Sequence, residues 1–218
     1  LEKYYSMKIS IITVCYNSET TISSTINSVL SQTYEKIEYI IIDGMSSDNT
    51  LKIIKSYSNR ISKVISEKDN GIYDALNKGI SFSSGEIIGF VHSDDLLYDE
   101  NVISKIASLF LKKKIDGVYG DLQYVKKKQT NKVVRYWKSS QYKSGMLKKG
   151  WMPAHPTFFL KKTIYLTHGK FNLKYKISAD YDFMIRILKD NNLKFYYFSS
   201  IITLMRIGGN SNKSIKNI

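Results

Sequence analysis

The chain has 218 residues, of which 43% are hydrophobic, and its 33 Lys and Arg against 19 Asp and Glu give a net charge of +14. This hydrophobic content allows a sizeable core and excludes wholesale disorder, and no apolar run approaches the roughly 20 residues of a membrane-spanning helix. The single cysteine, Cys15, excludes an intramolecular disulfide framework and fits a reducing compartment. Residues 1–16 lack a basic region followed by an apolar one, so no signal peptide is expected. We therefore expect a cytoplasmic protein starting natively at Met7, with residues 1–6 as a cloning or upstream remnant.

The positive charge is concentrated in lysine clusters. These are Lys112–Lys114, Lys126–Lys128, Lys148–Lys149 and Lys161–Lys162. Such charge attracts nucleic acid, anionic lipid or phosphorylated ligands. A solvated lysine-rich surface explains it equally well, so charge alone does not select a partner.

Strand-length apolar segments alternate with helical patterns over the first 120 residues. The expected strands cover residues 8–15, 37–42, 61–66, 86–91 and 117–120. The expected helices follow an N-cap at Asn17 or Ser18, follow the turn at residues 46–49, and cover about residues 71–82 and 101–111. This alternation predicts a mostly parallel α/β sheet, in which ligands bind beyond the carboxyl ends of the strands. Polar residues gather at those ends, namely Tyr16-Asn17, Asp43, Glu67–Asn70 and His92–Asp95.

The pattern changes beyond residue 121. Residues 122–137 resemble a lysine-rich hairpin, residues 143–156 are irregular, and residues 157–160 are expected to form a strand. A helix is predicted over residues 179–189, followed by one or two strands over residues 194–205. The inward side chains of that helix are expected to be Phe183, Met184, Ile187 and Leu188. No repeat or long linker divides the chain, so we expect one domain over 7–218, with halves at 7–121 and 122–218.

Two common nucleotide-binding signatures are missing. The first strand is followed by Tyr16-Asn17-Ser18-Glu19, without the glycines that let a Rossmann turn approach a pyrophosphate. There is also no Gly-x-x-x-x-Gly-Lys-Ser/Thr loop. If phosphates bind here, a metal and lysines must neutralise them.

Two adjacent carboxylates, Asp94 and Asp95, end the fourth strand. Adjacent Asp side chains repel each other, and a buried strand cannot end in them without partners. A divalent cation is the simplest partner, because hard cations prefer oxygen ligands. The bland alternative is a solvated turn that caps the helix near Asn101.

Several motifs follow one another in an order that resembles family 2 glycosyltransferases. They are Ile11–Asn17, Ile42–Thr50, Glu67–Gly79, His92–Asp95, Ala154–Phe159 and Ser178–Asp182. Each motif alone is moderately specific, whereas their order over residues 8–210 is strongly so. The resemblance implies a GT-A fold with a smaller C-terminal acceptor-side extension, and inverting sugar transfer from a nucleotide-diphosphate sugar.

The resemblance assigns the carboxylate pair to the donor. It implies that Asp94 lies near the ribose and that Asp95 holds Mn²⁺ or Mg²⁺ against the diphosphate, where negative charge develops as the nucleotide leaves. His155 matches a family histidine that touches the metal, the diphosphate or the acceptor, with a structural histidine as the alternative. A late basic loop of the family matches residues 206–211, beginning at Arg206, with a disordered tail as the alternative.

Other donor contacts are implied in and after the first strand, after the second and fourth strands, and in the third helix. The implied residues are Thr13, Tyr16, Asn17, Asp43, Ser46, Asn77, Lys78 and Ser93. Family members often have a second acid after Asp43, and Gly44 stands there instead, which weakens a choice of uridine over guanosine. For Tyr16 the alternative is core packing, for Asp43 an ordinary turn, and for Asn77 and Lys78 a solvated helix face.

Asp180 is the predicted general base. An inverting transferase needs a carboxylate that takes the proton of the attacking acceptor hydroxyl, and the family's catalytic Asp begins a helix as Asp180 is expected to do. Asp182 is the nearby alternative, and helix capping is the structural one.

The expected function is therefore metal-dependent transfer of a sugar, with a UDP-sugar favoured, to a saccharide acceptor in bacterial surface polysaccharide synthesis. The acceptor is expected to be linked to a polyprenyl diphosphate, and the protein to rest on the inner membrane surface through its basic, aromatic second half. No nucleic-acid partner is expected. The alternatives are a metal-dependent nucleotidyltransferase, a nucleic-acid-binding protein, and a catalytically silent transferase.

Overall fold

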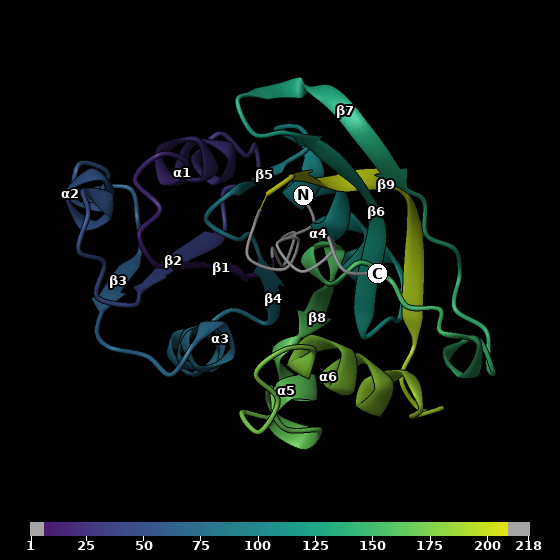
Figure 1. The fold of residues 1–218 in the computed structure, drawn as a ribbon. Helices are drawn as coiled ribbons and strands as arrows, with labels where there is room; N and C mark the ends of the chain where they lie inside the picture. The colour runs from purple at the N-terminus through teal and green to yellow at the C-terminus, as the bar shows by residue number, and fades with distance from the viewer. Residues whose placement is uncertain (1–6, 209–218) are drawn as a thin grey trace, which may run out of the picture.

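A computed structural model describes residues 7–208 and contains one nine-stranded sheet with helices on both faces (Figure 1). Its first half holds four parallel strands in the order β3 (Lys63–Ser66), β2 (Ile37–Asp43), β1 (Ile9–Cys15) and β4 (Ile87–Phe90). Every residue of β1 is buried, because a β-branched run suits a strand that is covered on both faces. The carboxyl ends of β1, β2 and β4 therefore meet at one edge of the sheet.

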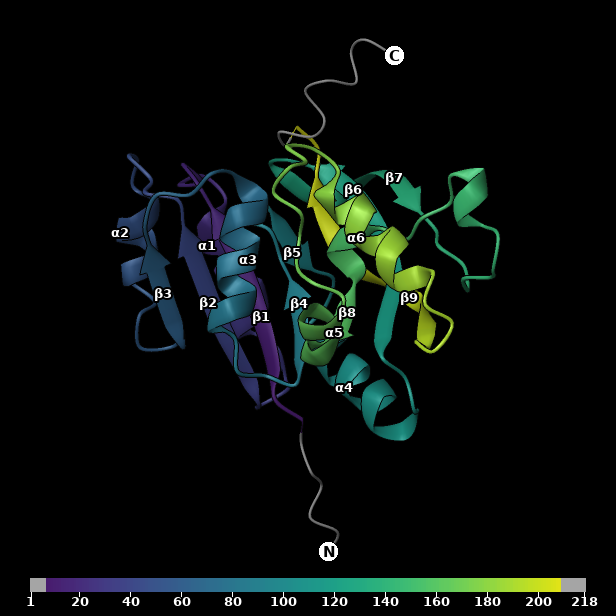
Figure 2. The ribbon, with the colours of Figure 1, turned by 90° about the horizontal axis from the view of Figure 1, so that it is seen from below.

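Two layers of helices cover this sheet. The helices α1 (Ile22–Leu30), α2 (Thr50–Lys55) and α4 (Val102–Lys112) pack on one face. The helices α3 (Ile72–Phe82), α5 (Lys162–Thr167) and α6 (Ala179–Leu188) pack on the other (Figure 2). As predicted, the apolar side of α6 is buried through Phe183, Met184, Ile187 and Leu188.

The second half makes the sheet mixed rather than purely parallel. The strand β8 (Phe159–Lys161) runs antiparallel between β4 and β6 (Gly117–Lys126), and β9 (Phe195–Arg206) runs parallel to β6. The hairpin partner β7 (Gln129–Trp137) and the short β5 (Asp95–Leu97) are also antiparallel to their neighbours. Two single turns of 3-10 helix, Leu147–Lys149 and His155–Thr157, interrupt the irregular region. The predicted α/β class and hairpin are confirmed, and one sheet runs through both predicted halves.

Three local predictions need correction. The first helix begins at Ile22 rather than after Asn17 or Ser18, because residues 17–21 form a loop that ends at the N-cap Thr21. The fifth predicted strand extends to Lys126. Asp95 does not cap a helix but begins β5. None of the helices between residues 7 and 208 is both long and apolar enough to cross a bilayer.

Candidate active site

Asp95 is the least satisfied polar residue at the carboxyl edge. It is 1% exposed, and neither of its carboxylate oxygens has a hydrogen-bond partner among the described residues. Burial and the charge of Asp94 raise the pKa of Asp95 well above its usual range, while Arg206 opposes that shift. The alternative of a solvated helix cap is wrong, because the Asp95 side chain is buried. A buried carboxylate without a partner is costly unless something binds it.

Arg206 holds the backbone of this carboxylate pair. Its buried guanidinium donates from Nη1 to the carbonyl oxygen of Asp94 (2.7 Å), from Nε to that of Lys127 (3.1 Å), and from Nη2 to Oγ of Ser24 (2.9 Å). The predicted basic residue is thus the last residue of β9 and not part of a late loop. The rest of the predicted loop, residues 209–211, lies outside the described residues.

Asp180 lies in the first turn of α6, where it meets α3. The hydroxyl of Tyr73 donates to Oδ1 of Asp180 (2.7 Å), and burial followed by this hydrogen bond raises the pKa of Tyr73. The alternative base, Asp182, instead pairs with Arg186 at 3.0 Å. The structure therefore leaves Asp180 as the first-turn carboxylate that faces the other site residues, and its predicted catalytic role stays a prediction.

Two histidines stand between the carboxylate pair and Asp180. The ring centroids of His92 and His155 are 6.0 Å apart, and those of His155 and Phe90 are 5.6 Å apart. Burial lowers the pKa of His155 to about 4 against the opposing charge of Asp180, so the ring is neutral at pH 7. Burial also lowers the pKa of His92 against the charges of Asp94 and Asp180, and its Nδ1 has no partner among the described residues. Three segments distant in sequence, at residues 92–95, 155 and 180, thus converge on one place.

A different kind of site surrounds the ends of β1 and β2. Asp43 is fully buried and accepts hydrogen bonds from Oγ of Ser46 and Oγ of Ser66 (2.7 Å). Asn17, at a φ of 48°, accepts from the backbone nitrogen of Ser47 (2.9 Å) and donates its own backbone N–H to Oγ of Ser46 (2.9 Å). These bonds fix the two loops to each other, so Asp43, Ser46 and Asn17 shape this edge in the structure, and their donor contacts stay predictions.

The side chains of Tyr16 and Asp69 both approach Gly44. Tyr16 is 63% exposed, so the alternative of core packing is wrong. A Cβ on Gly44 would lie 2.4 Å from Oδ2 of Asp69 and 3.5 Å from Cδ2 of Tyr16, which means that only glycine allows this close approach. The glycine that departs from the family pattern therefore makes room for an acid from the end of β3. The position of Asp69 in a polar run after a strand was the signal that could have singled it out.

The remaining predicted donor residues are engaged within the chain. Thr13 is fully buried, and its hydroxyl donates to the carbonyl oxygen of Val91 (2.7 Å), so it acts inside the sheet rather than at its surface. The amide of Asn77 bonds both backbone groups of Phe171 (2.8 and 3.0 Å). The ammonium of Lys78 pairs with Glu67 (2.9 Å). The hydroxyl of Ser93 lies 2.9 Å from that of Ser18.

The residues present fit a divalent cation whose remaining ligands come from the substrate and water. No three His, Cys, Asp or Glu side chains in residues 7–208 converge as a ready-made metal site. The unpartnered carboxylate of Asp95 supplies the oxygen donors that such a cation prefers. Mg²⁺ is commonly held by one or two carboxylates together with substrate phosphates and water, which matches this donor set. The assignment of His155 as a further ligand stays a prediction.

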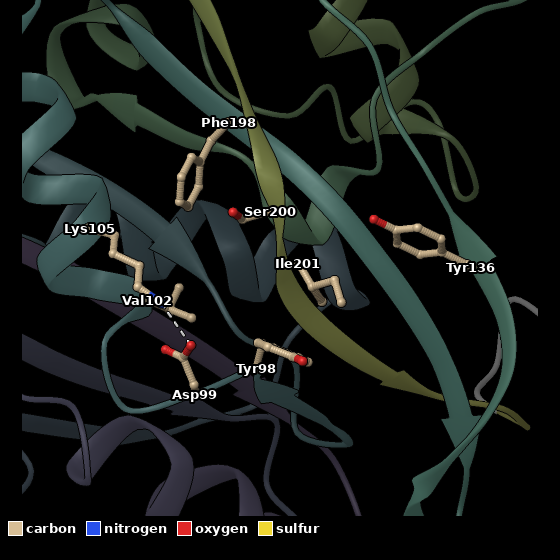
Figure 3. A pocket seen from close by; sticks show the side chains of 8 residues that line it. All are labelled: Tyr98, Asp99, Val102, Lys105, Tyr136, Phe198, Ser200 and Ile201. Atoms are coloured by element: carbon tan, nitrogen blue, oxygen red, sulfur yellow. Dashed lines mark hydrogen bonds and ion pairs between the residues drawn. The ribbon is translucent and has the colours of Figure 1, made fainter.

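The well-formed pocket of about 270 Å³ in Figure 3 lies elsewhere, between α4, β7 and β9. Its wall is a bulge of β9, since Tyr119 pairs with Tyr197 whereas Asp121 pairs with Ile201. Gly120 permits the bulge, because a Cβ there would lie 2.7 Å from the carbonyl oxygen of Ser200. None of the predicted site residues lines this pocket.

Comparison with known proteins agrees with this geometry. Residues 10–186 match the model of glycosyl transferase family 2, and the chain belongs to that family. It is 31% identical over 210 residues to the UDP-Glc:alpha-D-GlcNAc-diphosphoundecaprenol beta-1,3-glucosyltransferase WfgD of Escherichia coli, covering 95% of this chain and 80% of WfgD. It is 28% identical over 208 residues to a PGL/p-HBAD biosynthesis glycosyltransferase of Mycobacterium bovis, covering 93% of this chain and 78% of that protein.

Solved structures share the fold. The S. aureus TarS 1-349 complex with UDP-GlcNAc superimposes with a TM-score of 0.74 at 19% identity, covering 92% of this chain and 58% of that one. The mannosyltransferase PcManGT of Pyrobaculum calidifontis, in complex with GDP-Man and Mn²⁺, gives a TM-score of 0.69 at 14% identity, covering 91% and 57%. The chain thus spans less than two thirds of these structures, and at such identities the likeness shows the GT-A fold alone.

Proposed function

We propose that the protein is a metal-dependent inverting glycosyltransferase that moves a sugar from a nucleotide-diphosphate sugar to a saccharide hydroxyl. The observation that carries the proposal is the buried carboxylate of Asp95, which has no partner within residues 7–208, at the same edge as Asp180. The carboxylate of Asp95 can bind a cation, and the carboxylate of Asp180 can accept a proton. A sugar transferase needs both, because a diphosphate departs while a hydroxyl attacks.

Asp95, with Asp94 beside it, would hold Mn²⁺ or Mg²⁺. A cation bound there supplies electrostatic stabilisation of the negative charge that develops on the leaving diphosphate. The backbone bond from Arg206 to Asp94 fixes the loop that carries both carboxylates (2.7 Å). A fixed loop lowers the cost of organising the site when the donor binds.

Asp180 would take the proton of the acceptor hydroxyl. Tyr73 donates to Oδ1, so the carboxylate is oriented and Oδ2 is left for the incoming hydroxyl. The C–O bond to the acceptor forms as the bond between the anomeric carbon and the diphosphate oxygen breaks, with inversion at that carbon. The neutral ring of His155 lines this space without adding positive charge beside the base.

A UDP-sugar is the donor that we favour. Tyr16 offers an exposed aromatic ring beside Gly44, and Asp69 offers a carboxylate beside the same glycine. These groups suit stacking and hydrogen bonding of a nucleobase. The names of WfgD and of the TarS complex both include a UDP-sugar, and the acceptor in the name of WfgD is a diphosphoundecaprenol-linked sugar. We extend the proposal to a lipid-linked acceptor in surface polysaccharide synthesis, used at the cytoplasmic face of the membrane.

A panel of UDP- and GDP-sugars tests the proposal. Each is incubated with the protein with and without Mn²⁺, and release of the nucleoside diphosphate and thermal stabilisation are measured. We expect Mn²⁺-dependent stabilisation by at least one UDP-sugar and release of UDP rather than pyrophosphate, which separates sugar transfer from nucleotidyl transfer. A panel without any response would refute the proposal.

A further inference from the structure

The segment between Phe171 and α6 exposes apolar side chains beside the candidate base. Its sequence alternates apolar and basic residues from Leu173 through Lys174, Tyr175, Lys176 and Ile177. The exposed fractions of its three apolar side chains are 52% for Leu173, 47% for Tyr175 and 80% for Ile177. No acidic residue occurs between Lys170 and Ala179. We call residues 172–178 the docking loop.

The docking loop has a defined conformation. The amide of Asn77 on α3 donates to the carbonyl oxygen of Phe171 (2.8 Å) and accepts its N–H (3.0 Å), which anchors the start of the loop. Asn172 accepts from the backbone nitrogens of Lys174 and Tyr175 (both 3.1 Å). Ser178 ends the loop at a φ of 70°, a conformation that costs a non-glycine residue free energy. The fold therefore maintains the apolar side chains at the surface.

The loop lies at the active edge of the molecule. Figure 2 shows the connection from α5 to α6 running to the upper edge of the view, where α6 begins and where the strands of the first half end. Asp180 follows the last loop residue by two positions. An object that contacts the loop is thereby close to the site where the acceptor hydroxyl must be placed.

We propose that the docking loop binds the surface of an anionic lipid bilayer, with Leu173, Tyr175 and Ile177 entering the interfacial region. Apolar and aromatic side chains gain free energy when they leave water for the headgroup and acyl boundary. Lys174 and Lys176, which alternate with them, are attracted to anionic headgroups. The loop would hold Asp180 at the depth of a lipid-linked sugar. This role in placing Asp180 rests on the proposed function, whereas the binding of the loop to lipid does not.

Another occupant of the loop and another surface of the protein are less well matched. In a symmetric dimer the loop would face its own copy across an isologous interface, and the lysines of both copies would repel each other in a protein of net charge +14. Another exposed apolar pair, Val133 and Val134 on β7, belongs to an edge strand. Lysines next to such an edge also serve to prevent strand pairing.

Vesicle flotation of the whole protein tests the inference without any sugar donor. Neutral phosphatidylcholine vesicles are compared with vesicles that contain about 30% phosphatidylglycerol, at low and high salt. We expect binding to the anionic vesicles that salt weakens. Leu173→Ser/Ile177→Ser and Lys174→Gln/Lys176→Gln should each reduce it by roughly tenfold or more.

Matched controls carry the same changes elsewhere. Val133→Ser/Val134→Ser removes two half-exposed apolar side chains from β7, and Lys112→Gln/Lys114→Gln removes two charges at the end of α4. Both should bind vesicles as the parent protein does. Circular dichroism and thermal unfolding verify that all variants fold.

Three results would overturn the inference. The first is a parent protein that does not bind anionic vesicles. The second is loop variants that bind these vesicles as strongly as the parent does. The third is a parent protein that is a dimer by light scattering and loop variants that are monomers. UDP-dependent stabilisation, measured in the same preparations without lipid, is independent of the loop. If UDP stabilises the protein but the vesicle results fail, the docking inference is wrong and the proposed function stands. If the vesicle results hold but UDP does not stabilise the parent protein, the proposed function is wrong and the binding of the loop to lipid stands.

Discussion

The two polar regions at the carboxyl edge differ in how far the chain satisfies its own polar atoms. After β1 and β2, the buried Asp43 accepts hydrogen bonds from Ser46 and Ser66, and Asn17 ties one loop to the other. After β4, the equally buried Asp95 has no partner among the described residues, and neither has Nδ1 of His92. The first region is complete without a ligand, whereas the second is incomplete without one.

This difference separates a frame from a reaction centre. A buried polar group that is paired stabilises one conformation, whereas an unpaired one lowers stability until something binds it. Burial is nearly the same for Asp43 and Asp95, so burial does not distinguish them. The hydrogen-bond partners do, and substitutions in the two regions should therefore have opposite effects on stability.

The largest effect on catalysis is expected at Asp180. Asp180→Asn removes the proton acceptor but keeps the shape and the hydrogen bond from Tyr73, so the turnover rate should fall by about 10²–10⁴-fold. Donor binding, measured by calorimetry with a UDP-sugar and Mn²⁺, should be unchanged. The matched control is Asp182→Asn, two residues away and paired with Arg186, which should retain most activity. Full activity of Asp180→Asn would show that another group is the base.

The second prediction compares Asp95 with Asp43 directly. Asp95→Asn should lower metal-dependent turnover by about 10²–10³-fold and yet raise the metal-free melting temperature, because it removes an unpartnered buried carboxylate. Asp43→Asn should lower the melting temperature, since it disturbs bonds worth about 1–3 kcal/mol. Thermal unfolding with and without Mn²⁺ measures both. Destabilisation of the metal-free protein by both substitutions would contradict the distinction between the two regions.

The sequence was sufficient to predict the elements that hydrophobic periodicity indicates and the site residues that the order of the motifs indicates. The four parallel strands, the hairpin and α6 follow from runs of β-branched residues and a helical stripe, and the carboxylates were found by their place after a strand. It could not reveal β5, because three residues are too few to show a period, whereas the strand predicted over residues 157–160 overlaps β8. Nor could it reveal which polar atoms remain unpaired, since the partners of Asp43 and Asn77 come from segments 23 and 94 residues away.

A smaller effect on catalysis is expected at Tyr73. Tyr73→Phe removes the hydrogen bond to Oδ1 of Asp180 and leaves the ring in place, so the turnover rate should fall roughly tenfold, as for the loss of one hydrogen bond to a charged group. The KM for the donor should not change, because the residue orients the base only. Tyr57→Phe is the control, since its hydroxyl bonds Ser23 instead. A change in donor KM at constant turnover would contradict a positioning role.

The smallest effect on catalysis is expected at Glu38. This residue lies at the amino edge of the sheet but, like Asp43, it is buried and paired within the chain, so it extends the frame. Burial opposes its ionisation, but hydrogen bonds from Ser10 and Ser84 and the charge of Lys8 outweigh burial and lower the pKa of Glu38 to about 2. Because the unfolded chain binds the proton near pH 4.5, this stabilisation is complete above that pH and is lost as the pH falls toward 2.

Glu38→Gln should therefore lower the free energy of unfolding at pH 7 by roughly 2–3 kcal/mol. It should also make this free energy depend less on pH below 4.5, with turnover at pH 7 unchanged. Urea unfolding at pH 7, 4.5 and 3 measures the effect. Glu86→Gln is the control, because among the described residues the side chain of Glu86 accepts only a 3.2 Å bond from the exposed backbone nitrogen of Lys8. If Glu38→Gln impaired turnover as strongly as Tyr73→Phe, the frame and the reaction centre would not be separable, since a change at one edge of the sheet would then reach the base at the other.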